Sequence, residues 1–315
     1  MRVLHVVEAQ RRYVASLDEA PTPTVRPGEV LVHVAASGLN RADLSQIAGR
    51  YPPPPGEPEG LGLEVSGTVK GSGERVCALL AGGGHAEYVA APEGQVFAAP
   101  SRLDLVAAGA VPEAFLTAFL SLVVQAELRA GQTVLVHAGA SGVGLAAIQV
   151  AKYLGARVVA TTRTREKIAA LERADLAVHA PTGDFAGAIA ARFGSDAVDV
   201  VLDPVGAATL AQDLAVLAPR GQVICLAALS GAQAEVDVSL LMRKQARIVG
   251  SMLRSRSREE KAALVARFRQ EVLPGFDAGT LSASVDSAFP PERAAEAFQR
   301  MRDNQNVGKL VIDWR

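Results

Sequence analysis

The sequence lacks several features that would assign a protein to a class at once. It has two cysteines in 315 residues, Cys77 and Cys225. Both lie in apolar stretches, so we expect small buried side chains and no disulfide framework. Lys and Arg (32) nearly balance Asp and Glu (33), for a formal net charge of -1, so charge gives no reason to expect nucleic acid or an anionic membrane as partner. No apolar run reaches the ~18 residues of a membrane span, and no targeting segment is recognisable, so a cytoplasmic protein is expected.

Metal-ligand patterns are missing as well. A catalytic zinc takes three protein ligands, and a structural zinc usually takes four that include closely spaced cysteines. None of the histidines pairs at ligand spacing with either cysteine; they are His5, His33, His85, His137 and His179. The sequence therefore predicts no metal site.

The chain does have the length and patterning of two folded domains. Hydrophobic residues make up 49% and charged residues 21% of the sequence, as in ordinary globular proteins, and 315 residues exceed one compact core. The first hundred residues alternate short apolar strands with Gly- and Pro-rich turns. The strands expected there are 29–34, 74–80, 86–91 and 95–98, and the four prolines 52–55 predict a rigid loop.

From about residue 112 the pattern changes to alternating strands and helices. Strands are expected at 133–138, 157–161, 176–179, 199–203, 221–226 and 247–252, and helices at 143–154, 166–172, 185–193 and 208–217. This alternation predicts an α/β domain with a doubly wound parallel sheet. A polar helix at 258–271, a helix at 291–301 and a strand at 309–313 then suggest a return to the first domain.

The sharpest motif is the glycine-rich turn Gly139-Ala140-Ser141-Gly142-Val143-Gly144 between a strand and a helix. Glycines let the chain turn tightly and let a pyrophosphate approach bare backbone N–H groups at the positive end of the helix. The spacing G-x-x-G-x-G is a weak signal alone, but its strand–turn–helix–strand context is strong. We therefore predict a dinucleotide site here, with Leu226 at the end of a later strand as a further cofactor contact.

The end of the second strand of this domain indicates which dinucleotide binds. An NAD site carries Asp or Glu there, for the ribose 2′-hydroxyl. This strand instead runs into Thr161-Thr162-Arg163-Thr164-Arg165, followed by Lys167. Guanidinium and ammonium groups suit a 2′-phosphate, so the pattern favours NADPH; the alternative is a solvated, charged helix start.

Several segments, taken in their order along the sequence, resemble a known family, and together they span the whole chain. They are Ser37–Leu44, Tyr51–Gly56, Leu61–Gly67, Pro112–Ala118, the glycine turn, Ser251–Arg256 and Asn306–Lys309. With them the chain resembles the zinc-free quinone oxidoreductase (ζ-crystallin-like) branch of the medium-chain dehydrogenases/reductases, and most closely its tumour-suppressor-inducible subgroup. Zinc relatives carry a ligand Cys near Leu39 and a ligand His in the place of Leu63, and both ligands are missing here.

The resemblance implies a GroES-like domain (1–114 and 256–315) and a Rossmann NADPH-binding domain (115–255), with a cleft between them for nicotinamide and an apolar quinone. It also implies a homodimer through the edge strand near 247–252. By position, Asn40, Asp43 and Tyr51 resemble cleft residues near the nicotinamide. The implied cofactor contacts are Thr117, Gly142, Val143, Thr164, Lys167 and Asn306. The family's adenosine-contacting Tyr is replaced by Ala180 or Pro181, for which a stacked Arg163 is one substitute.

Reduction of a carbonyl without a metal needs donors that meet the growing negative charge on oxygen. The Asn40 amide and the Tyr51 hydroxyl are the candidates, and Tyr51 could also donate a proton. The alternatives are an Asx-type turn for Asn40, a packed loop aromatic for Tyr51 and a loop organiser for Asp43. His85 is expected to be a loop residue.

Two other functions fit the same residues. A zinc-free enoyl or enone reductase would share the fold and the cofactor turn but deliver hydride to a carbon–carbon double bond, and Arg254 with Arg256 could hold an acyl carrier. A non-enzymatic NADPH-binding protein with a structural or sensing role is the third hypothesis. Fold analogy bears less on substrate than on cofactor, so NADPH-dependent quinone reduction is the leading interpretation and not the sole one.

Overall fold

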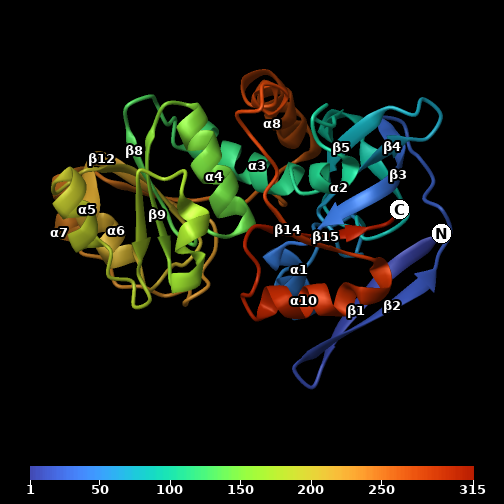
Figure 1. Cartoon of the computed structure of the whole chain (residues 1–315), viewed down its shortest axis with the longest axis horizontal. Coiled ribbons are helices and arrows are strands. Elements are labelled where there is room, and N and C mark those ends of the chain that lie inside the picture. The colour runs from blue at the N-terminus through green and yellow to red at the C-terminus, as the bar shows by residue number, and fades with distance from the viewer. The chain divides into compact units, whose positions relative to one another are not determined.

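The computed structural model describes all residues 1–315, which form two compact units (Figure 1). Unit 1 comprises Met1–Leu116 and Leu253–Arg315, and unit 2 comprises Thr117–Met252. Unit 2 is thus one continuous stretch of chain, whereas unit 1 is assembled from two segments.

A seven-stranded sheet forms the centre of unit 1. Its order is β14-β15-β3-β4-β5-β7, and β6 also pairs with β3. The strands are β3 (Glu29–Gly38), β4 (Glu64–Val69), β5 (Arg75–Leu79), β6 (Tyr88–Pro92), β7 (Val96–Ala98), β14 (Val285–Phe289) and β15 (Lys309–Asp313). Since β15 pairs antiparallel with β3, the second segment of unit 1 completes a sheet that the first segment begins.

An N-terminal hairpin, β1 (Arg2–Ala9) and β2 (Arg12–Glu19), pairs antiparallel. Strand β1 continues past Val7 through Glu8 and Ala9, because it stays paired with β2 as far as the turn, where Ala9 lies opposite Arg12. Its two turn residues, Gln10 and Arg11, have φ of 49° and 61°, the conformation of the tight turns that match strand twist.

Helices surround the sheet of unit 1, and aromatic side chains fill the space beneath them. Phe298 is fully buried, with its ring centroid 5.8 Å from that of Tyr13 and 6.0 Å from that of His85. The helices are α1 (Arg41–Ile47), α2 (Leu105–Ala108), α3 (Pro112–Phe119), α8 (Arg258–Glu271), α9 (Pro274–Asp277) and α10 (Ala294–Arg302). The chain passes from unit 1 to unit 2 within α3.

Unit 2 is a six-stranded parallel sheet in the order β10-β9-β8-β11-β12-β13. Its strands are β8 (Thr133–Val136), β9 (Arg157–Thr162), β10 (Leu176–His179), β11 (Val198–Asp203), β12 (Leu217–Cys225) and β13 (Arg247–Gly250). Helices α4 (Gly142–Tyr153), α5 (Ala186–Phe193), α6 (Leu210–Val216) and α7 (Val238–Lys244) lie on both sides (Figure 1). The strand order is that of dinucleotide-binding domains, in which β8 and β11 flank the point where the order reverses. The predicted doubly wound α/β fold is confirmed.

Several local expectations differ from the structure. Residues Arg165–Leu171 form a 3-10 helix where an α-helix was expected, and Leu120–Gln125 form a π-helical turn. The sequence pattern did not reveal α7 or β14, because α7 leaves apolar side chains exposed and β14 carries Asp and Ser in a half-buried strand. Cys77 is buried as expected, but Cys225 is only partly buried; both are free thiols.

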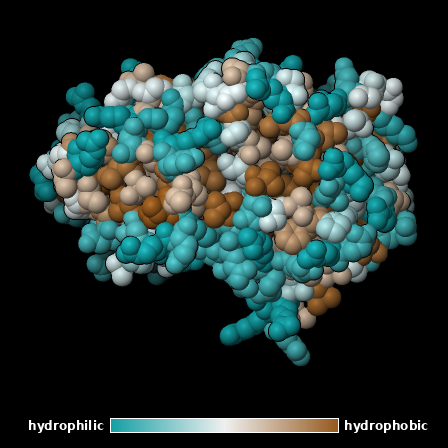
Figure 2. Space-filling model, viewed as in Figure 1, coloured by the Kyte–Doolittle hydropathy of each residue, from teal (hydrophilic) through white to brown (hydrophobic).

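The surface is mostly hydrophilic on the face shown in Figure 2, with apolar patches among the polar side chains. No helix is both long and apolar enough to cross a bilayer. The large exposed hydrophobic side chains are Val7, Val14, Val25, Leu229, Val238, Met242, Ile248 and Met252. Five of these eight belong to unit 2.

Two helical glycines of unit 2 give opposite predictions on replacement by alanine. A Cβ on Gly144 would lie 2.5 Å from the Ala138 carbonyl oxygen and 2.6 Å from that of Gly139, whereas a Cβ on Gly187 meets nothing within 4 Å. We expect Gly144→Ala to destabilise by about 1–3 kcal/mol through overpacking. Gly187→Ala should stabilise by up to about 1 kcal/mol through helix propensity. Thermal and urea unfolding of the two variants measure both effects, and a Gly144→Ala protein as stable as the wild type would contradict the contact.

Candidate functional site

The glycine turn lies at the carboxyl end of β8, next to the point where the strand order reverses. The Gly139 N–H donates to the Thr161 carbonyl at 2.8 Å, which anchors the turn to β9. A Cβ on Gly139 would lie 3.0 Å from Leu171 and 3.1 Å from Ala160. Ala138, just before the turn, has a φ of 49°. Close packing on both sides therefore holds the turn against the sheet.

Ser141 begins helix α4 as its N-cap. Its hydroxyl accepts a hydrogen bond from the Gly144 N–H at 3.0 Å, so one of the first free donors of the helix is satisfied. The N–H groups of Gly142 and Val143 have no protein acceptor. They remain available at the positive end of a twelve-residue helix, an arrangement suited to a phosphate. Ala140 is buried beneath this turn.

The cationic residues follow directly after β9. Arg163 is exposed, Thr164 is partly exposed, and Lys167 is 8% exposed. The Thr164 N–H donates to the Thr162 hydroxyl at 3.2 Å, and the Lys167 N–H donates to the Thr164 carbonyl at 3.1 Å. These local hydrogen bonds fix the turn that follows β9. Residues 161–165 include no carboxylate.

The end of β11 is stabilised by Asp203, which is fully buried. Its carboxylate accepts from the Val205 N–H at 2.6 Å, from the Gly206 N–H at 3.1 Å and from the Thr209 hydroxyl at 3.2 Å. These hydrogen bonds fix the turn that follows β11. The Leu226 N–H donates to the Asp203 carbonyl at 2.8 Å, so Leu226 lies at the same edge of the sheet.

A buried His–Asp pair lies next to the start of the glycine turn. His137 Nε2 lies 2.7 Å from Asp213 Oδ1, and His137 Nδ1 lies 2.8 Å from the Thr161 hydroxyl. Burial raises the pKa of the Asp213 carboxyl to about 6, against the lowering effect of His137. The pair joins β8, β9 and α6 immediately before Ala138.

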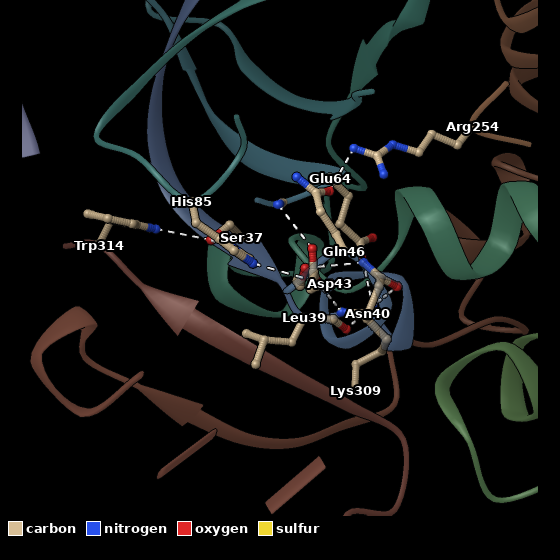
Figure 3. A network of polar contacts seen from close by, with 12 residues as sticks. Ser37, Leu39, Asn40, Asp43, Gln46, Glu64, His85, Arg254, Lys309 and Trp314 are labelled. Carbon is tan, nitrogen blue, oxygen red and sulfur yellow. Dashed lines mark hydrogen bonds and ion pairs between the residues drawn. The ribbon is translucent and has the colours of Figure 1, made fainter. Parts of the chain in front are cut away.

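A second set of polar side chains lies in unit 1, centred on Asn40 (Figure 3). Asn40 Nδ2 donates to the Gly38 carbonyl at 3.2 Å and to Glu64 Oε1 at 3.0 Å, and Asn40 Oδ1 accepts from Lys309 Nζ at 2.6 Å. An amide has two N–H donors, and both are used here. A substrate oxygen would have to displace one of these partners to reach the amide.

Glu64 and Lys309 form a fully buried ion pair, with Nζ and Oε1 2.5 Å apart. Lys309 also donates to the Leu39 carbonyl at 2.7 Å, so its three N–H groups all have acceptors. The second oxygen of Glu64 accepts from the Glu113 N–H at 2.8 Å. Burial raises the pKa of the Glu113 carboxyl to about 8, and Glu64 adds to this while Lys309 opposes it.

Asp43, in α1, is buried and organises the start of its helix. It accepts from the Asn40 N–H at 2.7 Å and from the Gly62 N–H at 3.1 Å. Its Oδ2 lies 3.7 Å from His85 Nε2. Burial acts to raise the pKa of Asp43, but His85 and the two backbone donors outweigh it and lower the pKa.

His85 continues this chain of contacts; it lies in the loop between β5 and β6, as expected, and its side chain is buried. The Trp314 indole N–H donates to the Ser37 hydroxyl at 3.0 Å, and Ser37 Oγ lies 2.7 Å from His85 Nδ1 (Figure 3). If Ser37 donates to Nδ1, the ring proton is on Nε2 and faces Asp43. Asp43 is thus embedded in a network of buried polar contacts.

Tyr51 is held from outside its own loop by Arg254. The guanidinium donates to the Tyr51 carbonyl at 3.0 Å and lies 5.1 Å from the centre of its ring. It also donates to the Ala81 carbonyl and to Gln46 Oε1, each at 2.8 Å. The Tyr51 hydroxyl makes no hydrogen bond within the protein, and burial, followed by the charge of Glu113, raises its pKa.

The structure thus gathers the predicted residues into two sets. Unit 2 brings the glycine turn, Arg163, Thr164, Lys167 and Leu226 to one edge of its sheet, and unit 1 brings Asn40, Asp43 and Tyr51 around α1. Thr117 lies in α3, and the Asn306 amide donates to the Gly308 carbonyl at 2.7 Å. A cavity of about 470 Å³ in unit 1, between Arg26, Glu57, Gly82 and Arg258, is lined by none of the predicted site residues.

Three residues of the polar network were not singled out from the sequence: Glu64, Glu113 and Lys309. A signal was present, because Glu64 stands between Leu63 and Val65 in a buried strand, and an ionisable side chain in such a run needs a partner. The partner of Glu64, however, is Lys309, near the other end of the sequence. No three or more His, Cys, Asp or Glu side chains are grouped so as to hold a metal ion.

Two known protein families match parts of the chain, one within unit 1 and one that covers most of unit 2 and continues into α8. Residues 26–101 match the alcohol dehydrogenase GroES-like domain, and residues 142–269 match the zinc-binding dehydrogenase domain. The names describe the families and carry no assignment of zinc to this chain.

Several relatives match this chain over nearly its whole length. The quinone oxidoreductase of Lama guanicoe is 30% identical, over 99% of this chain and 97% of its own length. The quinone oxidoreductase of Thermus thermophilus, solved also in complex with NADPH, is 32% identical with a TM-score of 0.83, covering 99% of this chain and 100% of that one. The CurK enoyl reductase is 25% identical with a TM-score of 0.82, covering 99% and 98%. The chain is therefore an oxidoreductase of the medium-chain dehydrogenase/reductase superfamily, with quinone oxidoreductases among its full-length relatives.

Proposed function

We propose that this protein is an NADPH-dependent, zinc-independent quinone oxidoreductase. The observation that carries the cofactor choice is the end of β9, where Arg163, Thr164 and Lys167 follow the strand and no carboxylate is present to bind a ribose 2′-hydroxyl. The quinone oxidoreductases among the relatives support the acceptor class.

The residues of unit 2 would hold the cofactor by its phosphates. The free N–H groups of Gly142 and Val143 suit the pyrophosphate, and the Arg163 guanidinium with Thr164 and Lys167 suits the 2′-phosphate. Bound NADPH would supply the hydride. Leu226, Thr117 and Asn306 remain proposed contacts to the rest of the cofactor, and Arg163 a proposed stacking partner of the adenine.

The residues of unit 1 would bind the acceptor and handle its charge. Tyr51 is the proposed donor to the acceptor oxygen, since its hydroxyl has no protein partner and its raised pKa keeps it protonated at neutral pH. Asn40 and Asp43 are proposed to position the loop, because their polar atoms already have partners. Buried Leu39 and Leu63 occupy the region where the zinc relatives carry ligands, which supports a metal-free mechanism.

Carbon–carbon double-bond reduction is the second candidate function. It is favoured by the similarity to the CurK enoyl reductase over 99% of the chain. The fold and the cofactor turn would serve both reactions, and the acceptor alone would differ.

Steady-state oxidation of NADPH with ortho- and para-quinones, and in parallel with enones and an enoyl thioester, tests the acceptor class. We expect turnover with the quinones because they are strong hydride acceptors that need positioning more than activation. Turnover with enones or the thioester alone would move the enzyme to the double-bond reductases and leave the cofactor assignment intact.

The 2′-phosphate assignment predicts a selective loss in cofactor affinity. Arg163→Ala or Lys167→Ala should raise the KM for NADPH by about 10- to 100-fold, as expected for loss of a charged hydrogen bond of about 1.5–3 kcal/mol, and change the KM for NADH little. Arg157→Ala is the matched control, because Arg157 is an exposed cation at the opposite end of the same strand. Equal effects on both cofactors would refute the assignment.

We further propose a homodimer through β13, the edge strand of unit 2. An unpaired edge offers backbone donors and acceptors to a second copy, and Ile248 (39% exposed) and Met252 (53% exposed) lie in and just after it. Light scattering should give a dimer mass for the wild type and a monomer for Ile248→Lys. Val14→Lys, at an exposed apolar site in unit 1, should stay dimeric. A monomeric wild type at working concentration would exclude the dimer.

A further inference from the structure

The side-chain amide of Gln95 is buried and makes no hydrogen bond within the protein. The residue is 2% exposed and ends the 3-10 helix Glu93–Gln95 of unit 1. Buried side-chain amides nearly always have a partner, because an unpaired one loses its hydrogen bonds to water without replacement. Gln95 lines the cavity of about 470 Å³ in unit 1. Its N–H groups and its carbonyl oxygen are therefore left for whatever fills that cavity.

The Arg26 guanidinium lines the same cavity and has no acceptor within the protein. Its backbone is fixed, because the Arg26 N–H donates to Glu29 Oε2 at 3.1 Å and the Arg26 carbonyl accepts from the Glu29 N–H at 3.0 Å. The Glu93 N–H donates to the Gly28 carbonyl at 2.9 Å, so this turn is bonded to the 3-10 helix that carries Gln95. The fold thus holds an unpaired cation and an unpaired amide at one cavity.

Both carboxylates of the cavity already bind Arg258, the first residue of α8. The Arg258 guanidinium donates to both oxygens of Glu57, each at 3.2 Å, and to Glu29 Oε1 at 3.0 Å. The other Glu29 oxygen accepts from the Arg26 N–H. The two arginines balance the two glutamates in charge, and Arg26 alone among them keeps all of its side-chain donors. This arrangement suits a ligand with a single negative charge, for which Arg26 offers a charge-assisted hydrogen bond.

The rest of the cavity wall is largely apolar. A volume of about 470 Å³ falls within the range of about 300–1,000 Å³ that is usual for small-molecule sites. Proline rings are rigid, so much of this wall keeps its shape when the cavity is empty, and an aliphatic group fits against it. The apolar residues are Pro23, Pro58, Leu80, Ala90 and Pro92.

We propose that this cavity is a second ligand site, for a small carboxylic acid that also carries an amide and an aliphatic group, as an N-acylated amino acid does. The ligand carboxylate accepts from Arg26. The ligand amide donates to the Gln95 carbonyl oxygen and accepts from the Gln95 N–H, and the aliphatic group packs on Leu80 and the prolines. The site goes beyond the proposed oxidoreductase function, since no residue proposed for the cofactor or the acceptor lines this cavity.

Calorimetric titration with N-acetyl-leucine and two analogues tests each contact. N-acetyl-leucinamide lacks the negative charge, and isocaproate lacks the amide. We expect N-acetyl-leucine to bind about tenfold more tightly than either analogue, as one hydrogen bond to a charged or buried partner predicts. Arg26→Ala should weaken N-acetyl-leucine to the level of its amide, and Gln95→Leu should weaken it to the level of isocaproate.

Two control variants separate binding from folding. Arg269→Ala removes an exposed cation of α8 that does not line the cavity, and it should leave the Kd of N-acetyl-leucine unchanged. Gln222, in unit 2, is buried like Gln95 (4% exposed), but its Nε2 donates to the Ala126 carbonyl at 2.7 Å. Gln222→Leu should therefore lower the Tm and leave binding unchanged. Gln95→Leu loses no hydrogen bond within the protein, so its ligand-free Tm should stay the same or rise.

The proposal is overturned by the absence of saturable binding, by equal affinity for the three compounds, or by an unchanged Kd in both Arg26→Ala and Gln95→Leu. A fall in Tm for Gln95→Leu as large as that for Gln222→Leu would also overturn it, because Gln95 would then have a partner within the protein. Arg26 lies on an exposed turn, so its variant reports on the site even where Gln95→Leu fails to fold. The titrations need neither NADPH nor an acceptor, and their outcome is independent of the proposed function.

Discussion

The buried ion pair between Glu64 and Lys309 is the interaction on which the polar network of unit 1 depends. A lone carboxylate or ammonium in such an environment costs several kcal/mol, and the pair offsets this only because its remaining donors and acceptors are also satisfied. Those remaining bonds hold Asn40, the Leu39 carbonyl and the Glu113 N–H. The pair therefore decides where α1 and α3 begin relative to β4 and β15.

The candidate site residues of the two units differ in kind, with backbone groups in unit 2 and side chains in unit 1. In unit 2 the site is mainly backbone: a close-packed turn, a capped helix and free N–H groups, supported by the His137–Asp213 pair. In unit 1 it is a network of side chains, most of whose polar atoms already have partners. Satisfied networks are rigid, whereas the Tyr51 hydroxyl and the Glu113 carboxyl in the same unit make no hydrogen bond within the protein.

Much of the fold could be predicted from the sequence because it depends on local patterns. The bounds of β10, α8 and β15 were predicted to the residue, and the glycine turn was found because close packing demands glycine at Gly139 and Gly144. The strand 199–203 and its aspartate followed from an apolar run that ends in a turn. Each of these depends on neighbours within a few residues.

The side-chain network could not be predicted in the same way. The partners Glu64 and Lys309 are 245 positions apart in the chain (309 minus 64), and they meet only because β15 and β4 both pair with β3. The Asn40 amide shares this dependence in part: one N–H bonds locally to the Gly38 carbonyl, and the other bonds to Glu64, which the strand pairing brings close. An amide that looks available in the sequence is therefore already bonded in the structure. The roles of Asn40, Asp43 and Tyr51 in catalysis stay predictions.

The division of the chain has a consequence for the order in which the molecule is made. All of unit 2 precedes β14 and β15 in the sequence, and domains made from continuous stretches fold as they emerge during synthesis. The parallel sheet with its glycine turn is therefore complete while Glu64 still lacks Lys309 and the sheet of unit 1 still lacks two strands. A nascent chain stalled between unit 2 and β14 would therefore carry a complete unit 2 beside an incomplete unit 1.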